Sequence, residues 1–175
     1  AAKEINLDQD SDLQKKTAYI KKQEILKTYL QQKFLDRIMI SDTDLQQGRL
    51  RAGKQIFAQN IFCTDLAEAQ KIKYEITTTK DPNQVFYERG TALGWISFGT
   101  LDQAIEDTIY NLKAGEISAP VKSNYGYHIL KVDSVRMNYD FQMINPALQI
   151  QQITEIIRKR KVHSEIQKYL SELAE

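Results

Sequence analysis

The middle of this chain alternates strand signals with helix signals, whereas its two ends carry helix signals only. This contrast constrains the fold more than any other feature. From Ser11 to Ile40 there is no glycine and no proline, and polar residues separate apolar residues that recur at helical spacing. This pattern predicts one long amphipathic helix. Acidic and hydroxyl residues from Ser41 to Asp44 are typical of a helix start, so a short helix is expected from Thr43 to Arg51. The apolar residues of the long helix are Tyr19, Leu26, Leu30, Phe34 and Ile38.

Between Gly53 and Val135 the chain alternates strand signals and helix signals. β-Branched and aromatic residues in roughly alternating order predict strands, and capping residues before apolar periodic runs predict helices. A turn is expected at Asp81-Pro82-Asn83, and a tight turn is expected from Ser123 to Gly126. The predicted strands are 55–62, 93–96, 117–121 and 127–135. One helix is predicted over 66–76, and a second is predicted to begin at Thr100 or Asp102 and to end at Leu112.

A residue pattern typical of helices returns after Met137, and Pro146 is in a position suited to a first helical turn. Each helical end is too short to bury an apolar stripe alone, so the two ends are expected to pack on each other. The sequence therefore predicts an α+β fold in which a four-stranded sheet with helices is inserted into an all-α module. The predicted parts are residues 1–52, residues 55–135 and residues 138–175.

The composition excludes several classes of protein. Hydrophobic residues make up 42% of the chain and charged residues 27%, which is ordinary for a soluble globular protein. The net charge of +1 argues against a dedicated nucleic-acid binder. No apolar run approaches the roughly 18 residues that span a bilayer. Cys63 is the only cysteine, and His128 and His163 are the only histidines, so no intrachain disulfide and no cysteine-rich zinc site can form.

Three ordered segments resemble the parvulin-type, or rotamase, peptidyl-prolyl isomerases. Glu88 to Trp95 is similar to the Arg-Gly-Gly-Asp-Leu-Gly-Trp segment of that family. Leu112 to Val121 is similar to its Leu-x-x-Gly-Glu-Ile-Ser-x-Pro-Val segment, and Ser123 to Val132 to its Thr-x-Phe-Gly-Tyr-His-Ile-Ile-Lys-Val strand. The last two matches are long, specific and correctly spaced. The resemblance covers residues 55–135 and implies a parvulin-like fold for this part of the chain.

The resemblance also implies an apolar cup that holds a proline ring above a polar floor. His128 stands at the second of two family histidines and Asn60 at the first, and a neutral hydrogen bond between them is feasible. These two are the implied catalytic residues. No metal or cofactor is required, because the reaction only eases rotation about the X–Pro amide bond. The implied substrate-binding residues are Leu93, Leu101, Ile105, Tyr125 and Ser123.

The chain also departs from the family pattern. Ala92 stands in place of an aspartate, and Leu101 and Ile105 stand where methionine and phenylalanine are common, so an aromatic wall is lost. The acid or cysteine that precedes this motif in active members has only Asp81 as a candidate, one position out of register. No second helix of the family pattern is found between Ile76 and Asp81, so the domain is expected to be trimmed.

The helical segments on either side of residues 55–135 carry a second resemblance, which rests on their general residue pattern and not on a specific motif. Ile40 to Leu45 and Tyr169 to Leu173 are similar to helical segments that wrap around the parvulin domain in SurA and PrsA foldase–chaperones. This implies unfolded or extended proline-containing clients, no nucleic acid, and a periplasmic or lipoprotein-anchored, hence extracytoplasmic, location. The chain itself opens with polar residues and no apolar secretion segment, so from these residues alone a cytoplasmic protein and a mature fragment both stay open.

Plainer interpretations stay open for individual residues. Taken alone, His128 is a satisfied core histidine and the three cup residues are ordinary core. Cys63 with His128 would suggest a thiol nucleophile, but a structural cysteine is the expected alternative. The basic run Arg158 to Lys161 is expected to be solvated rather than to contact acidic clients or membranes. Aromatic residues of the helical ends, if exposed, would form a client-binding patch.

Three functions are consistent with these patterns. The leading one is a protein-folding factor that isomerises X–Pro bonds and also binds its clients as a chaperone. The alternative is a catalytically degenerate parvulin that acts as a holdase or peptide-binding module. The third is a structural adaptor, with a homodimer formed through swapped flanking helices.

Overall fold

The structure is a computed structural model that describes residues 10–174, so the polar opening of the chain lies outside the described residues. The chain forms two compact units. Among the described residues, one unit contains 10–39 together with 158–174, and the other contains 40–157. These boundaries differ from the predicted ones near 52–55 and 135–138, because residues around Ala52 and Ile153 pack with the loop at Phe98 in the sheet-bearing unit.

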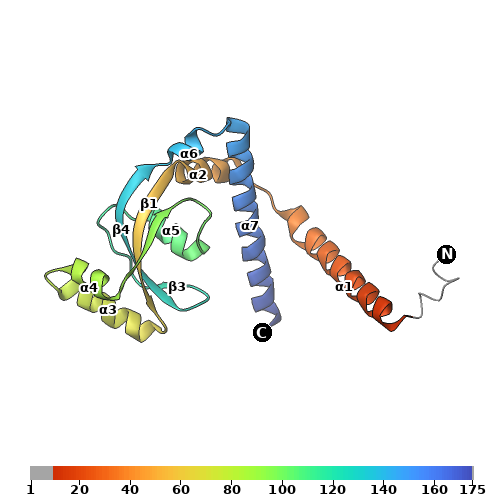
Figure 1. Cartoon of the computed structure of the whole chain (residues 1–175), viewed down its shortest axis with the longest axis horizontal. Helices are drawn as coiled ribbons and strands as arrows, with labels where there is room; N and C mark the ends of the chain where they lie inside the picture. Colours follow the sequence, from red (N-terminus) through yellow and green to blue (C-terminus); the bar gives the residue numbers. More distant parts are fainter. Residues whose placement is uncertain (1–9, 175) are drawn as a thin grey trace. The chain divides into compact units, whose positions relative to one another are not determined.

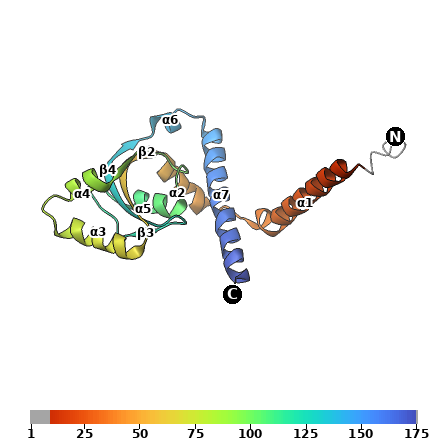
Figure 2. The ribbon, with the colours of Figure 1, turned by 60° about the horizontal axis from the view of Figure 1, so that its bottom comes forward.

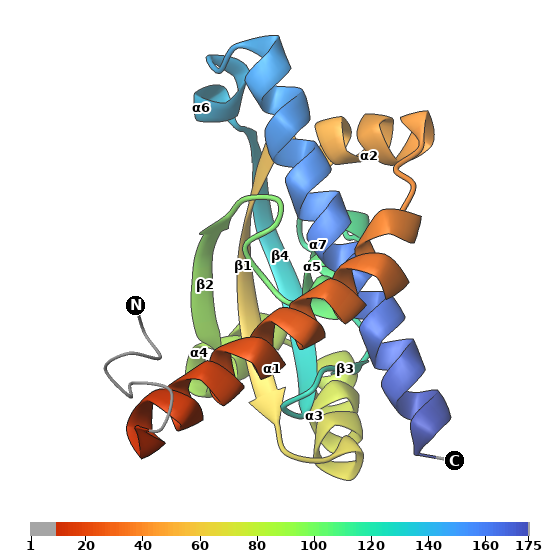
Figure 3. The ribbon, with the colours of Figure 1, turned by 90° about the vertical axis from the view of Figure 1, so that its right-hand side faces the viewer.

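A four-stranded antiparallel sheet lies at the centre of the unit formed by residues 40–157. The strands follow the order β2-β1-β4-β3, which can be followed in Figures 1 and 3. This confirms the predicted α+β fold. The predicted strand 117–121 is reduced to a bridge from Ile117 and a short β3, because Pro120 has no N–H to continue the ladder. The strands are β1 (Lys54–Cys63), β2 (Thr91–Ile96), β3 (Val121–Lys122) and β4 (Tyr127–Met137).

Each face of the sheet buries a separate apolar cluster. Side chains alternate between the faces along a strand. Ile61 and Ile129 therefore pack under α3 (Leu66–Thr78) and α4 (Pro82–Arg89), whereas Ala58 and Leu130 pack under α5 (Gln103–Asn111). Figure 2 shows these helices around the sheet. The α5 face is the one that matters for function, because it also carries His128.

The helix α4 corrects two predictions. Asp81 to Asn83 forms the start of a helix and not a turn, and a second helix is present directly after the stretch from Ile76 to Asp81 in which none was found. Asp81 caps the helix by accepting a hydrogen bond from the backbone nitrogen of Asn83 at 3.0 Å, and Pro82 takes the first helical position. Proline is tolerated there because that N–H has no helical partner. Val85 and Phe86 of this helix are buried against the sheet.

Helix α2 (Asp42–Ala52) and the first part of α7 (Pro146–Leu173) belong to the sheet-bearing unit. Ser41 and Asp44 form a capping box at the start of α2. Gly48 lets the two helices approach closely, because a Cβ atom there would lie 2.4 Å from Cγ2 of Ile153. A four-residue helix, α6 (Tyr139–Gln142), precedes α7.

The chain enters and leaves the sheet through residues that lie next to each other. Lys54, the first residue of β1, pairs with Met137, the last residue of β4. Just outside the strands, the backbone nitrogen of Asn138 donates to the carbonyl of Gly53 at 2.9 Å, and its side chain donates to the carbonyl of Ala52 at 3.0 Å. The two connections are therefore hydrogen-bonded to each other.

The other unit combines α1 with the last part of α7. Helix α1 (Ser11–Lys33) ends earlier than predicted and continues into a short 3-10 helix, η2 (Leu35–Arg37). Phe34 is buried and meets Tyr169 of α7 edge-on, with ring centroids 5.7 Å apart. Along α1 itself no residue is buried, and Tyr19, Leu26 and their neighbours are exposed. No helix within residues 10–174 is long and apolar enough to cross a membrane.

Candidate functional site

The His128 imidazole lies at the centre of a short chain of polar contacts. Only 7% of the residue is exposed. Its Nδ1 is 3.1 Å from Oδ1 of Asn60, and its Nε2 is 2.8 Å from Oγ of Ser123. Because Oδ1 of Asn60 can only accept, Nδ1 carries the proton in this arrangement, and Nε2 accepts from the Ser123 hydroxyl. The structure thus contains the Asn60–His128 hydrogen bond that the sequence made feasible.

Strand register explains why these residues meet. In the pairing of β1 with β4, Phe62 is opposite His128 and Asn60 is opposite Leu130. Residues two apart on a strand share a face, so Asn60, Phe62, His128 and Leu130 all point toward the side of the sheet that α5 covers. The Phe62 ring packs against the imidazole with centroids 5.3 Å apart. Phe62 was not predicted, although its alternation with Asn60 would have placed it beside the site.

The imidazole is held in its neutral form. Burial lowers the pKa of His128 below its ordinary value, and the nearby charge of Asp102, which favours the protonated form, is a smaller influence. Asp102 is the N-cap of α5 and accepts a hydrogen bond from the backbone nitrogen of Ala104 at 3.0 Å. The imidazole of His128 is therefore uncharged at neutral pH.

The three predicted cup residues lie on the same face of the sheet. Leu93, Leu101 and Ile105 are each partly buried and pack against the cluster that contains Leu130. Leu93 lies at a β-bulge, because Gly94 pairs with Ala58 while Ala92 pairs with the next residue of β1. Gly94 has a φ of 74°, which glycine adopts without strain. An apolar set with part of its surface open thus shares a sheet face with His128.

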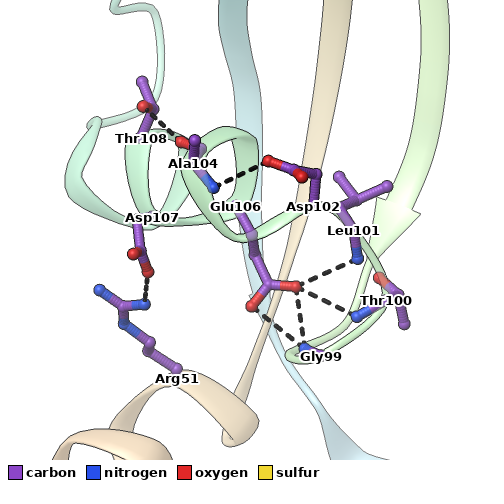
Figure 4. A network of polar contacts seen from close by, with 9 residues as sticks. All are labelled: Arg51, Gly99, Thr100, Leu101, Asp102, Ala104, Glu106, Asp107 and Thr108. Carbon is purple, nitrogen blue, oxygen red and sulfur yellow. Dashed lines mark hydrogen bonds and ion pairs between the residues drawn. The ribbon is translucent and has the colours of Figure 1, made fainter. Parts of the chain in front are cut away.

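A buried carboxylate that the sequence analysis did not identify holds the loop before α5. Glu106 is fully buried, and its Oε2 accepts hydrogen bonds from the backbone nitrogens of Gly99 at 2.9 Å, Thr100 at 3.1 Å and Leu101 at 3.3 Å (Figure 4). The neighbouring Asp107 forms an ion pair with Arg51 of α2. Glu106 therefore fixes the backbone that carries Leu101 and leads to Asp102.

Other predicted residues lie away from the imidazole. Tyr125 is 83% exposed, and its backbone nitrogen, not its ring, joins the site by donating to Oγ of Ser123 at 3.1 Å. Asp81 caps α4 and so has a structural role. Cys63 is buried on the sheet face opposite His128, where burial raises the pKa of its thiol. This arrangement fits the structural interpretation of Cys63 and not the nucleophilic one.

Metal chemistry has no evident ligand set in the described part of the chain. Across residues 10–174, no group of three or more His, Cys, Asp or Glu side chains is placed to hold a metal ion. What the site offers instead is a neutral imidazole, a carboxamide, a hydroxyl and a set of apolar side chains. Such groups can bind a neutral, weakly polar segment and orient it by hydrogen bonds.

Comparison with known proteins assigns the sheet-bearing segment to a class. Residues 67–134 match the family model described as Rotamase, PPIC-type PPIASE domain. This segment therefore matches a parvulin-type rotamase domain, and the chain is similar in sequence to PrsA and SurA foldases. Strand β1 with Asn60 precedes the matched residues, so the place of Asn60 in the site rests on its contact with His128.

Curated relatives extend the similarity beyond that domain. Foldase protein PrsA of Geobacillus sp. (strain WCH70) is 27% identical over 147 residues, which are 79% of this chain and 53% of that protein. PrsA of Bacillus subtilis (strain 168) is 29% identical over 70% of this chain and 45% of its own length. Chaperone SurA of Saccharophagus degradans is 40% identical over 48% of this chain and 19% of that protein. The chain spans about half the length of the PrsA relatives it matches.

Solved structures of the same kind are also similar to this chain. A crystal structure of PrsA from Bacillus subtilis has a TM-score of 0.44 and 26% identity, over 94% of this chain and 68% of that one. The solution structure of NmPin, the parvulin of Nitrosopumilus maritimus, has a TM-score of 0.40 and 26% identity, over 46% of this chain and 97% of that one.

Proposed function

We propose that this chain is a protein-folding factor that catalyses cis/trans isomerisation of X–Pro bonds in unfolded clients. The rotamase match over residues 67–134 and the PrsA relatives support this activity. The observation that carries it is the placement of a neutral, hydrogen-bonded His128 on the same sheet face as the partly open apolar side chains of Leu93, Leu101 and Ile105.

The reaction sets modest chemical demands on such a site. The barrier of about 18–20 kcal/mol arises from the partial double bond of the amide, and no covalent bond is broken. In the twisted transition state the carbonyl oxygen carries less charge and the nitrogen is more basic than in either planar state. A catalyst gains by binding the twisted amide more tightly than the planar one.

Each residue of the site has a separate role in binding the twisted amide. Leu93, Leu101 and Ile105 hold the apolar proline ring. The neutral imidazole keeps charge out of the site and fixes Asn60 and Ser123 through its two nitrogens. Because Oδ1 of Asn60 faces the imidazole, its carboxamide N–H groups are the donors available to a prolyl nitrogen.

An isomer-exchange measurement tests the activity. The rate of cis-to-trans conversion in a short Ala-Pro-Phe peptide is followed by NMR exchange with and without micromolar protein. The proposal expects a rate that rises linearly with protein concentration. A rate equal to the uncatalysed one at every concentration would remove the isomerase activity and leave the holdase alternative, which the comparisons do not favour.

We further propose that the exposed apolar side chains of α1 bind client segments. Tyr19, Ile20, Ile25 and Leu26 are each at least half exposed, which is unusual for so many large apolar residues on one helix. The experiment is aggregation of a chemically unfolded client, followed by light scattering. The full chain should suppress scattering, and a variant with Ile20→Ser and Ile25→Ser should suppress it less while keeping its isomerase rate.

The PrsA and SurA relatives support an extracytoplasmic location, periplasmic or membrane-anchored. Fractionation of cells that express the whole gene tests this proposal, and recovery with cytoplasmic markers would overturn it.

We also propose a homodimer through the flanking helices, which sedimentation equilibrium tests. A mass of 20.3 kDa at all concentrations would exclude it.

A further inference from the structure

The unit formed by residues 10–39 and 158–174 contains a cavity of about 610 Å³. This volume lies within the range of about 300–1,000 Å³ that is typical of ligand sites. The pocket lies entirely on residues 33–39 and 161–172, which are parts of the same compact unit. Its residues include two aromatic and four cationic side chains, namely Phe34, Tyr169, Lys33, Arg37, Lys161 and Lys168. We call it the junction pocket.

The inner part of the junction pocket is apolar. Phe34 is buried, and its ring meets the ring of Tyr169 edge-on at 5.7 Å. Ile38 and Met39 extend this surface, and Met39 is highly exposed. Aromatic and thioether side chains adapt to apolar groups of different shapes. The pocket can therefore receive an aromatic or aliphatic side chain.

Two of the four cations of the pocket, Lys33 and Lys161, are held in place by other groups of the same unit. The ammonium group of Lys33 donates to the Tyr29 hydroxyl at 2.8 Å and lies 3.4 Å from the centroid of the Tyr169 ring. The hydrogen bond to Tyr29 and then that to Tyr169 raise the pKa of Lys33 and keep it protonated. The ammonium group of Lys161 donates to the carbonyl of Met39 at 3.0 Å. Charges that are already positioned lose little conformational entropy when a ligand binds.

The pocket carries more positive than negative charge. Four cationic side chains line it against two carboxylates, those of Glu165 and Glu172. Charge complementarity therefore favours a ligand with negative charge next to an apolar group.

We propose that the junction pocket binds an extended peptide segment in which an acidic side chain adjoins an aromatic or aliphatic one. This rests on the proposed function, in which the chain binds unfolded clients, and it names the client segments that the helical unit prefers. An anionic membrane is less well matched. The pocket is concave, and a continuous negative surface would repel Glu165 and Glu172 on its lining.

Titration with a defined peptide tests the inference. The probe is a short fluorescein-labelled peptide of phenylalanine, aspartate, glycine and serine, without proline, and its binding to the full chain is followed by fluorescence anisotropy. Two matched peptides carry asparagine in place of aspartate or serine in place of phenylalanine. Each replacement should weaken binding about tenfold, a loss of about 1.4 kcal/mol.

Charge reversals locate the binding. Arg37→Glu and Lys168→Glu should each weaken binding of the acidic peptide about tenfold. Lys22→Glu, on an exposed part of α1 outside the pocket, is the matched control and should change the affinity less than about twofold, because an exposed charge at a distance is screened by salt. An equal loss in the control, or equal binding of the asparagine peptide, would overturn the inference. So would binding to phosphatidylglycerol vesicles without binding to the peptide.

The outcome separates this inference from the proposed function. The isomerase rate of Lys168→Glu should equal that of the parent chain, because the residue lies in the other compact unit from His128. If the parent chain binds uncharged apolar peptides without preferring the acidic one, only the junction-pocket inference fails. If it binds no peptide and does not suppress aggregation, the chaperone part of the proposed function fails as well.

Discussion

Oε2 of Glu106 lies 2.9 Å from the backbone nitrogen of Gly99. The same oxygen also accepts from Thr100 and Leu101, so one fully buried carboxylate satisfies three successive N–H groups of the loop that leads to α5. A loop with three such donors would otherwise need water at this position. The backbone that carries Leu101 therefore depends on a carboxylate buried behind it.

We predict that Glu106→Gln destabilises the fold and lowers isomerase activity. The carboxamide keeps one accepting oxygen, but its NH2 group replaces Oε1, which accepts from the Gly99 nitrogen at 3.1 Å, and the remaining hydrogen bonds lose the charge of the carboxylate. Together these changes cost about 1–3 kcal/mol. Urea unfolding measures the change in the free energy of unfolding. The comparison variant is Asp107→Asn, whose partly exposed ion pair with Arg51 contributes about 0–1 kcal/mol. Equal unfolding midpoints for Glu106→Gln and the parent chain would contradict this role of Glu106.

His128→Ala should reduce the isomerase rate constant kcat/KM at least about tenfold, which corresponds to about 1.4 kcal/mol in the barrier. The substitution removes the partner of both Asn60 and Ser123. The chain supplies its own control in His163, which is exposed on α7, so that His163→Ala should leave the rate unchanged. Comparable losses in both variants would mean that the effect does not arise at the site.

Asn60→His should increase the isomerase rate by restoring the histidine pair of the parvulin family. Strand register places residue 60 on the face of His128, so the new imidazole can take the 3.1 Å contact with Nδ1. The new pair can share a proton, which a carboxamide cannot do, and the rate should acquire a dependence on pH near neutrality. A rate that stays the same or falls, with the fold intact by circular dichroism, would show that this role of Asn60 is wrong.

The stability of the protein should fall on the acidic side of neutrality because of His128. Burial lowers its pKa in the folded state, so below the unfolded-state value near 6.5 the unfolded chain binds the proton more readily. The contribution to stability is complete above that pH and is lost as the pH falls toward the folded-state pKa. Urea unfolding at about pH 7.5 and pH 5.5 should show a larger loss for the parent chain than for His128→Gln, which cannot titrate. Parallel losses would contradict the assignment.

Gly48→Ala should destabilise the packing of α2 on α7. Alanine in place of glycine within a helix normally stabilises it by about 1 kcal/mol. Here the added Cβ would lie 2.4 Å from Cγ2 of Ile153, and such overpacking costs about 1–3 kcal/mol. A double-mutant cycle with Ile153→Ala, measured by urea unfolding, should give a favourable coupling energy, since the second change removes the clash. Additive effects would indicate that the helices separate to accommodate the methyl group.

Much of the sheet could be predicted because its strands carry their own signals. The alternation of β1 and the Tyr-His-Ile-Leu run that opens β4 predict both the strands and the face on which His128 lies. Helix α4 was missed because Asp-Pro-Asn is typical of a turn as well as of a helix start. Only the burial of Val85 and Phe86 on the sheet decides between the two.

The supporting contacts of the site were harder to predict, because they depend on how the strands and helices pack and not on a residue pattern in the sequence. Glu106 resembles a solvent-facing charge, although it precedes the buried Ile109 by three residues and so shares a helix face with it. Phe62 lies beside His128 only through the register of β1 with β4. Tyr19 and Leu26 of α1 follow the predicted helical spacing yet are exposed, and periodicity alone does not tell whether another element covers a residue.

The pairing of Lys54 with Met137, and of Gly53 with Asn138, has a consequence for how such a chain can evolve and be engineered. A segment whose two connections run side by side can be removed, duplicated or exchanged for another while the helices on either side keep a short gap to close. The gap between residues 53 and 138 needs only a tight hairpin linker. A new helical carrier joined at this seam would have to reproduce the packing of Ala52 and Ile153 on Phe98 and the ion pair of Arg51 with Asp107.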